Sequence, residues 1–327
     1  MLFGAPGLVH RLMSVIISRQ MNPTSVCPRP PEPCVQDDGR VVTCRHPVQP
    51  PTTPPPMILE PLVIFELATL GLFTGFMAGL LGIGGGMIMV PFLTMVLSVR
   101  HIPDDLGLKM AIATSMSTII FTSISSVRAH HQKGAVRWPL VRALAPGLVL
   151  GSVISSLGVF TVIKGQFLGF FFALFVAFSA TQMFLDRKPK PSRQLPGTVG
   201  LLGAGGFIGF LSGLVGAGGA FVSVPFMAWC NVLIPNAVAT SAALGFPIAL
   251  SNTVGYVFSG WNEPNLPVGS LGYVWLPGAV IIAACSVLTA PAGARAAHRL
   301  PVKRLKQIFA VMLYILSGFM FYRGFTH

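Results

Sequence analysis

Charged residues are scarce in this sequence: Asp, Glu, Lys and Arg together make up only 9% of its 327 residues. Soluble domains carry about 25%, so the shortage excludes an ordinary soluble enzyme or a disordered regulator, although the length alone would allow two soluble domains. The hydrophobic fraction is 53% and the mean hydropathy is +0.73. This balance predicts a polytopic membrane protein whose long sides face lipid.

Acidic residues are rarer still, since 9 Asp and Glu stand against 22 Lys and Arg and give a formal net charge of +13. A basic balance indicates nucleic-acid binding only where the charge gathers on one face beside aromatic residues. Here the basic residues form short clusters between apolar runs, the pattern of cytoplasmic loops. Nucleic acid is therefore not expected as a partner.

Motifs for metal ions, nucleotides and cofactors are also missing. Cys27, Cys34 and Cys44 have no pair of histidines at ligand spacing, and Cys230 and Cys285 lie in apolar segments. No Gly-Lys-Ser/Thr sequence is present, and no G-x-G-x-x-G follows a predicted strand. We therefore expect neither a metal site nor a cofactor.

Proline gathers in one place. Residues 23–56 hold 11 of the 28 prolines, together with many polar residues. Such a stretch cannot hold a helix or bury a core, so residues 1–57 are predicted to be a disordered, Pro-rich extension. Its first 20 residues have only a short apolar run and no small-residue cleavage pattern, which argues against a signal peptide.

Long apolar runs alternate with short breaks from Pro61 onward. Because a helix needs about 20 apolar residues to cross the hydrocarbon core, we expect an all-α fold with about eight to ten membrane segments. The candidate spans are 61–82, 106–127, 139–160, 165–185, 198–217, 236–258, 271–290 and 305–323. Two shorter stretches, 87–99 and 220–234, each follow a glycine cluster and are interpreted as half-helices or re-entrant segments.

An internal repeat is the clearest feature that is present. Four matches in the same order indicate a duplication, with a first transmembrane repeat at 58–190 and a second at 191–327. The matched segments are Gly75–Gly86 with Gly209–Ala220, Val90–Phe92 with Val224–Phe226, Ala113–Ser115 with Ala239–Ser241, and Pro146–Gly147 with Pro277–Gly278.

Basic loops predict the orientation. The loop between the repeats and the loops 128–138 and 291–306 are rich in Lys and Arg, whereas 259–270 has neither. Cytoplasmic loops carry the excess of Lys and Arg, and five segments per repeat place all these loops consistently. Five is odd, so the second repeat would be inverted relative to the first; four segments per repeat would make them parallel.

The glycine clusters are predicted to form a substrate site. Consecutive glycines break a helix and leave amides unpaired, which is tolerated at membrane depth only beside protein or a water-lined cavity. A half-helix that starts there points its positive end into the site, which suits an anion. The alternative is that the glycines only let helices pack closely, and we assign Gly75–Gly79 and Gly209–Gly213 to packing. The predicted site glycines are Gly82, Gly84, Gly85, Gly86, Gly216, Gly218 and Gly219, followed by Pro91 and Pro225.

The sequence resembles the TauE/SafE sulfite-exporter family, also called the 4-toluene sulfonate uptake permeases, over about residues 61–325. The resemblance rests on Gly79–Gly86 with Val90-Pro91, on the second copy from Gly213 to Pro225, on Ala239–Ser241, and on Leu266–Val274. It implies a permease that moves sulfur-containing anions such as sulfite, sulfonates or sulfoacetate. One departure is Ala220, where the first repeat has Gly86, and a tighter start of the second half-helix is expected there.

Polar residues inside the apolar segments complete the predicted site. Thr114 and Ser115, with their counterparts Thr240 and Ser241, can donate hydrogen bonds to an anion without burying a charge. The alternative is that these hydroxyls bond to their own helix or join neighbouring helices. Glu66 lies inside the first segment and is a candidate proton relay.

The sequence therefore favours a secondary transporter in the cell membrane, with a small anionic substrate between the repeats and the lipid bilayer as its surroundings. Homo-oligomerisation is left open. One alternative is a non-transporting membrane scaffold or sensor derived from a transporter. Another is an intramembrane enzyme, but Glu66 alone does not supply the acid–base pair that an enzyme needs.

Overall fold

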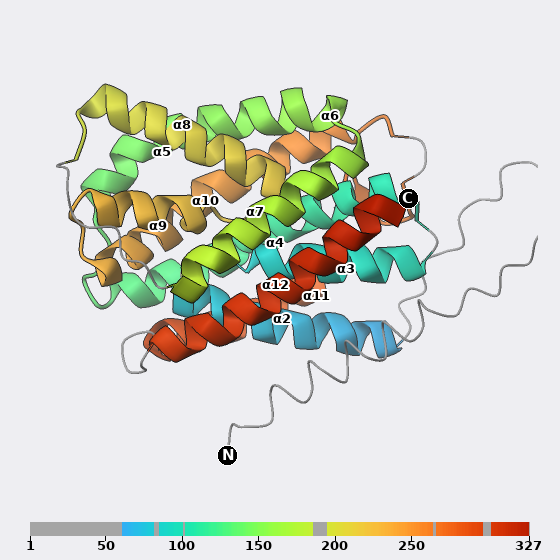
Figure 1. The fold of residues 1–327 in the computed structure, drawn as a ribbon, viewed down its shortest axis with the longest axis horizontal. Coiled ribbons are helices and arrows are strands. Elements are labelled where there is room, and N and C mark those ends of the chain that lie inside the picture. The colour runs from blue at the N-terminus through green and yellow to red at the C-terminus, as the bar shows by residue number, and fades with distance from the viewer. Residues whose placement is uncertain are drawn as a thin grey trace, which may run out of the picture. The chain divides into compact units, whose positions relative to one another are not determined.

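The computed structural model describes residues 61–81, 85–100, 102–185, 195–263, 266–296 and 302–326, so the extension predicted at 1–57 lies outside the described residues. The described residues are almost entirely helical, with one two-stranded antiparallel hairpin (Figure 1). The elements in chain order are α2 (Pro61–Leu81), α3 (Gly86–Val99), α4 (Asp104–His131), α5 (Trp138–Val153), the π-helix η1 (Ile154–Val159), α6 (Phe160–Val162), α7 (Gly165–Leu185), α8 (Thr198–Val215), α9 (Ala220–Trp229), α10 (Ile234–Ser259), β1 (Ser270–Leu271), β2 (Val274–Trp275), α11 (Leu276–Ala296) and α12 (Val302–Thr326).

Eight helices of the described chain are long and apolar enough to cross a bilayer, which confirms the expected all-α polytopic fold. One of them runs from Trp138 to Val162 through α5, η1 and α6. The expected span 271–290 is wrong at its start, because the hairpin occupies residues 270–275 and α11 follows it. The expected segment 220–234 is too long: α9 ends at Trp229, and the chain turns through left-handed Asn231 before α10 begins.

Close helix pairs hold the bundle together. The most extensive contacts in the described chain join α2 with α11, α5 with α8, α7 with α12, and α4 with α10; Figure 1 shows α7 and α12 side by side. Glycines allow the first two pairs to approach. A Cβ atom on Gly75 would lie 2.4 Å from the main chain of Ser286, and one on Gly209 would lie 2.2 Å from the Leu148 carbonyl oxygen. The assignment of these glycines to packing is therefore confirmed.

The four pairs form a pattern that is unchanged when the two predicted repeats are exchanged. In the predicted repeats, α2 corresponds to α8 and α5 to α11, so exchanging the repeats turns the α2–α11 pair into the α8–α5 pair. The other two pairs, α4–α10 and α7–α12, each join a helix to its own counterpart. The helices α4 and α10 run antiparallel, since Thr114 in the first half of α4 and Tyr256 near the end of α10 both bind the hairpin. Inverted repeats would have this arrangement; the duplication and its boundaries stay predictions.

The acidic residues of the described chain lie at one end of these helices. The ends of α4 and α11 away from the hairpin carry Arg128 and Arg295. The helices α2 and α11 run in the same direction, because Gly71 lies against Ile282 and Gly79 against Ala290. The acidic residues of the described chain therefore all lie at the hairpin end: Glu66, Asp104, Asp105 and Glu263. By the excess of Lys and Arg in cytoplasmic loops, the hairpin end would be the outer end, and this orientation stays a prediction.

Aromatic rings and a lysine cover the hairpin end of α4. The Nζ atom of Lys109 lies 5.9 Å from the ring centre of Phe160 and 5.8 Å from that of Tyr273. The Tyr273 hydroxyl donates to Oε2 of Glu263 at 3.4 Å. Burial, and next the neighbouring Glu263 carboxylate, raise the pKa of Tyr273, so its hydroxyl stays protonated at neutral pH.

Gly209→Ala tests the close approach of α5 and α8. Its new methyl group would meet the Leu148 carbonyl, and overpacking of this kind costs about 1–3 kcal/mol. Gly203→Ala is the matched control, because it lies on the same helix with no atom within 4 Å of its Cβ position. We expect thermal unfolding in detergent to occur at a lower temperature for Gly209→Ala and at an unchanged or higher one for Gly203→Ala. Equal melting temperatures would contradict the packing role.

Candidate functional site

Two glycine breaks interrupt the chain at matching places in its two halves. Each separates a full-length helix from a short one: α2 from α3, and α8 from α9. The residue before each short helix is a left-handed glycine, with φ 73° and ψ −7° at Gly85 and φ 75° and ψ −7° at Gly219. The two half-helices therefore start from the same backbone conformation, and the tighter start expected from Ala220 is not found.

The two breaks meet inside the protein. A Cβ atom on Gly86 would lie 2.1 Å from the carbonyl oxygen of Gly216, so only glycine fits there. The Ser115 hydroxyl on α4 lies 3.0 Å from the same carbonyl oxygen and 2.8 Å from the Ile112 carbonyl of its own helix, and its hydrogen is shared between the two. The structure thus brings together the predicted site residues Ser115, Gly86 and Gly216. Gly82 and Gly84 lie outside the described residues.

Free amides mark the start of both half-helices. The Gly85 carbonyl accepts hydrogen bonds from the amides of Ile88 and Met89, and the Gly219 carbonyl accepts those of Val222 and Ser223. The two amides before each of these pairs have no acceptor within the helix. Each half-helix therefore presents to the interior its positive end and two amides that have no acceptor within the helix, which is the chemistry that binds an anion.

The two predicted site prolines lie one turn further along. Pro91 and Pro225 are in the second turns of α3 and α9, inside the helices rather than at the breaks. Proline has no amide hydrogen, so each leaves the carbonyl four residues earlier without its helical donor. Both prolines therefore lie within the half-helices, one turn after the amides that face the interior.

Three of the four predicted site hydroxyls hold other parts of the protein. The Thr114 hydroxyl accepts the amide hydrogen of Trp275 at 3.0 Å, and the Thr240 hydroxyl accepts that of Arg137 at 3.1 Å. Thr114 thereby binds the residue before α11, and Thr240 binds the residue before α5. Each of these helices packs against the other half of the chain, α11 on α2 and α5 on α8. Ser241 shares a hydrogen bond of 2.7 Å with Ser223 on α9. Only Ser115 contacts a break directly.

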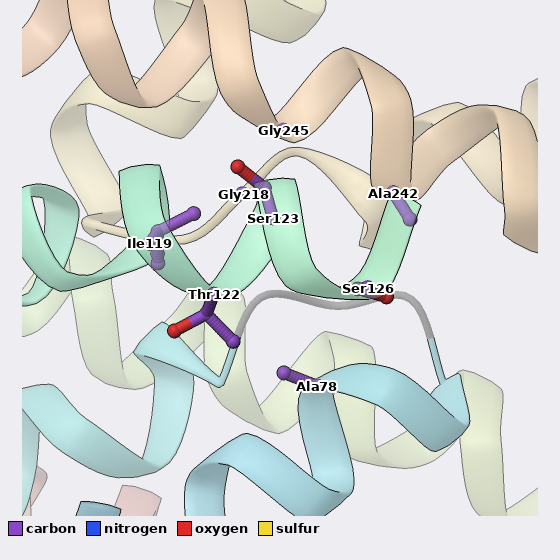
Figure 2. A pocket seen from close by; sticks show the side chains of 8 residues that line it. All are labelled: Ala78, Ile119, Thr122, Ser123, Ser126, Gly218, Ala242 and Gly245. Carbon is purple, nitrogen blue, oxygen red and sulfur yellow. The ribbon is translucent and has the colours of Figure 1, made fainter. Parts of the chain in front are cut away.

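A small cavity lies beside the second break (Figure 2). Its volume of about 10 Å³ is room for about one water molecule. Figure 2 shows Thr122, Ser123 and Ser126 of α4 around it, with Ala78 of α2 on one side and Gly218 of the break on another. The remaining lining residues are Ile119, Ala242 and Gly245.

Ser126 is the cavity's available polar group. Its side chain is 2% exposed, and its Oγ atom has no hydrogen-bond partner within the described part of the chain. By contrast, the Thr122 hydroxyl bonds with Ser286 at 2.7 Å and with the Thr118 carbonyl at 3.0 Å. Ser123 donates to Ile120 in its own helix. A buried hydroxyl without a partner costs about 1–3 kcal/mol, so Ser126 would gain from a ligand or a water molecule.

The lining of the cavity carries no ionisable side chain, and no group of three His, Cys, Asp or Glu in the described residues could hold a metal ion. The polar atoms available to a ligand are therefore hydroxyls and backbone groups. This set can bind an anion by donation, and it supplies no acid–base pair for catalysis.

Comparison with known proteins agrees with this architecture. A family model described as "Sulfite exporter TauE/SafE" matches residues 67–320. The chain belongs to the TauE/SafE family. It is 36% identical over 253 residues to a probable membrane transporter protein of Haemophilus influenzae, covering 77% of this chain and 95% of the relative. It is 28% identical over 273 residues to another from Methanocaldococcus jannaschii, covering 81% and 96%. No solved structure matches the chain.

The cavity residues of this TauE/SafE protein were missed by sequence reasoning, although α4 contains a signal for them. Ser115, Thr118, Thr122 and Ser126 recur at intervals of three and four residues, which places them on one face of the helix. The matched Ala-Thr-Ser triplets contain only the start of this row, Ser115. Its far end, at Ser126, is the part that reaches the cavity.

Glu66 lies far from the cavity. It is in the second turn of α2, 12 residues before Ala78, which amounts to about 18 Å along the helix axis. Its side chain is half-buried at the hairpin end of the bundle. A proton relay through Glu66 would therefore act at that end of the transport path, and this role stays a prediction.

A matching pair of contacts binds the two helices that precede the breaks. His130 Nε2 lies 3.3 Å from the Gly79 carbonyl oxygen, and the Tyr256 hydroxyl donates to the Gly213 carbonyl. Gly79 and Gly213 occupy the same place in the repeated glycine motif. Each contact satisfies a carbonyl in the last turns of the helix before the break.

Ser115→Ala tests the hydrogen bond to the second break. It removes the donor to the Gly216 carbonyl, and one hydrogen bond contributes about 0.5–1.5 kcal/mol. Ser117→Ala is the matched control, because that hydroxyl is also buried but bonds only to Thr114 of its own helix. We expect Ser115→Ala to unfold at lower denaturant concentration than Ser117→Ala. The same midpoint for both variants would show that the bond between α4 and the break is not stabilising.

Proposed function

We propose that this protein is a secondary transporter of small sulfur-containing anions such as sulfite, sulfonates or sulfoacetate. Membership of the TauE/SafE family and the names of its relatives support the broader statement, a multi-pass membrane transporter protein. The observation that carries the proposal is the meeting of the two half-helix starts, where Gly86 lies against Gly216. Paired broken helices of this kind form substrate sites at the midplane of transporters.

The chemistry at the breaks favours an anion over a cation. The free groups at the starts of α3 and α9 are amide hydrogens at the positive ends of the helices. Ser126 adds a hydroxyl that can donate. The lining has no carboxylate to attract a cation. A sulfite or sulfonate group carries several acceptor oxygens around one centre, so it suits a lining whose polar groups donate hydrogen bonds.

The size of the cavity indicates a closed state. A volume of about 10 Å³ holds about one water molecule, whereas a sulfite ion is larger. Substrate would enter after the halves move apart around the breaks. The antiparallel crossing of α4 and α10, with the cavity between them, suits rocking of one half against the other. No motif for nucleotide binding is present in the sequence, so an ion gradient or the anion's own gradient would drive transport.

A non-transporting scaffold or sensor is the second candidate function. It would keep the helix packing but would have no need for two half-helices that begin at left-handed glycines. The two functions therefore differ in what a change at the breaks does: it abolishes flux in a transporter and leaves a scaffold's binding unchanged.

Gly219→Ala tests the transport role. The substitution adds backbone strain at φ 75° and places a methyl group 2.7 Å from Ile248. Gly134→Ala carries the same kind of strain, at φ 65° in a loop with nothing within 4 Å; a left-handed alanine costs about 1–2 kcal/mol. In proteoliposomes we expect radiolabelled sulfite flux to fall at least tenfold for Gly219→Ala and to stay near wild type for Gly134→Ala. Equal flux in two folded variants would exclude the second break from the path.

Ser126→Ala tests the anion site directly. A hydrogen bond to a charged group contributes about 1.5–3 kcal/mol, so we expect the dissociation constant of sulfite to rise at least tenfold. Ser117→Ala should bind as the wild type does, because that hydroxyl faces its own helix. Microscale binding titrations with sulfite, sulfoacetate, taurine and an aryl sulfonate would identify the anion. If the wild type bound none of these, the sulfur-anion class would be wrong, while the broader transporter assignment would stand.

A further inference from the structure

A groove of about 310 Å³ lies between α4 and α11, apart from the central cavity. One part of its lining is apolar, formed by Phe121, Ile124 and Val287. The other part contains Arg128 and Gln132 from the end of α4. The groove thus has the two-part chemistry of an amphipathic ligand, with an apolar length and a polar end.

The groove starts near the membrane–water interface and extends toward the bilayer centre. Arg128 is in the last turn of α4, and the next residues lead to Trp138, whose indole nitrogen donates to Nδ1 of His131 at 3.2 Å. Exposed tryptophans gather at the membrane–water interface. Phe121 precedes Arg128 by two helical turns, which is about 10 Å toward the bilayer centre. A ligand with its charge at Arg128 would therefore extend its apolar part into the membrane.

The charge at the polar end is positive and uncompensated. Arg128 is exposed, and its guanidinium makes no side-chain hydrogen bond or ion pair with the described residues. The acidic residues of the described chain are at the opposite, hairpin end of the helices. Arg295 emerges from α11 one turn after the groove residue Pro291, to whose carbonyl its Nε atom donates at 3.3 Å. Two guanidinium groups therefore flank this end of the groove, and a negative group suits them.

We propose that this groove binds an anionic phospholipid, with its phosphate at Arg128 and Gln132 and an acyl chain along Phe121, Ile124 and Val287. A guanidinium can donate two parallel hydrogen bonds to phosphate, and the Gln132 amide can donate a third. Basic pockets between membrane helices on the cytoplasmic side suit anionic head groups, and the basic loops place this end of α4 on that side.

The position of the groove links lipid binding to the two halves of the protein. Its walls come from α4 of the first predicted repeat and α11 of the second, which Ser125 joins by donating to the Val287 carbonyl at 2.9 Å. Thr122, one turn earlier, lines the central cavity and bonds to Ser286 of α11. A bound lipid would stabilise this contact between α4 and α11 from the lipid-facing side. Anionic lipid should therefore raise the thermal stability of the protein whether or not a substrate is present.

Lipid titration of the purified protein in detergent tests the inference. We expect phosphatidylglycerol to bind about fivefold more tightly than phosphatidylcholine of the same chains, the ratio for one Lys or Arg near an anionic surface. Native mass spectrometry would give the ratio, and the shift in melting temperature would give its effect. Arg128→Gln should reduce the ratio to near one. Arg142→Gln is the matched control, because Arg142 is exposed in α5 near the same end but does not line the groove.

Two further measurements distinguish binding of the whole lipid from binding of its head group alone. Inorganic phosphate and glycerophosphoglycerol, which lack acyl chains, should not shift the melting temperature at the concentrations at which the lipid does. Ala129→Leu fills the groove without changing charge and should weaken both lipids. Equal binding of the two wild-type lipids, an unchanged ratio in Arg128→Gln, or full binding by Ala129→Leu would each overturn the proposal. Loss of the ratio in Arg142→Gln as well would assign it to overall charge instead.

Discussion

The unpaired backbone at the two glycine breaks is the constraint on which the rest of the structure depends. In lipid each amide and carbonyl needs a partner, so a broken helix is tolerated only inside the protein. The breaks meet that condition by lying against each other, with Gly86 on the Gly216 carbonyl and Ser115 bonded to the same oxygen. The surrounding helices also pack backbone to backbone, and glycines line the α2–α11 and α5–α8 contacts.

Much of the fold could be predicted from the sequence because hydropathy and helix length report directly on the bilayer. The spans and both short helices followed from that pattern. The hairpin at 270–275 did not, since its residues are as apolar as a span and only the left-handed Gly269 and Gly272 mark its turns. For the site, motifs located the breaks but not the cavity. Tertiary contacts decide which hydroxyls of a helix already have a hydrogen-bond partner. Thr114 and Thr240, for example, accept the amide hydrogens of Trp275 and Arg137.

The matching contacts of the two halves use different side chains for one task. His130 and Tyr256 occupy equivalent positions on α4 and α10 and bind equivalent carbonyls, those of Gly79 and Gly213. The backbone geometry is thus kept while the chemistry differs.

The same comparison of the two halves shows a second difference, at Ser126 and its counterpart. Counted from the Ala-Thr-Ser triplets, Asn252 is the counterpart of Ser126. The Asn252 amide nitrogen already donates to Ser152 and to the Ile248 carbonyl, so the atom it has left is an oxygen without a donor. An unpaired acceptor repels an anion, whereas an unpaired hydroxyl can turn its hydrogen toward one. Of these two counterparts, the one that leaves a donor unpaired is Ser126, and it lines the cavity.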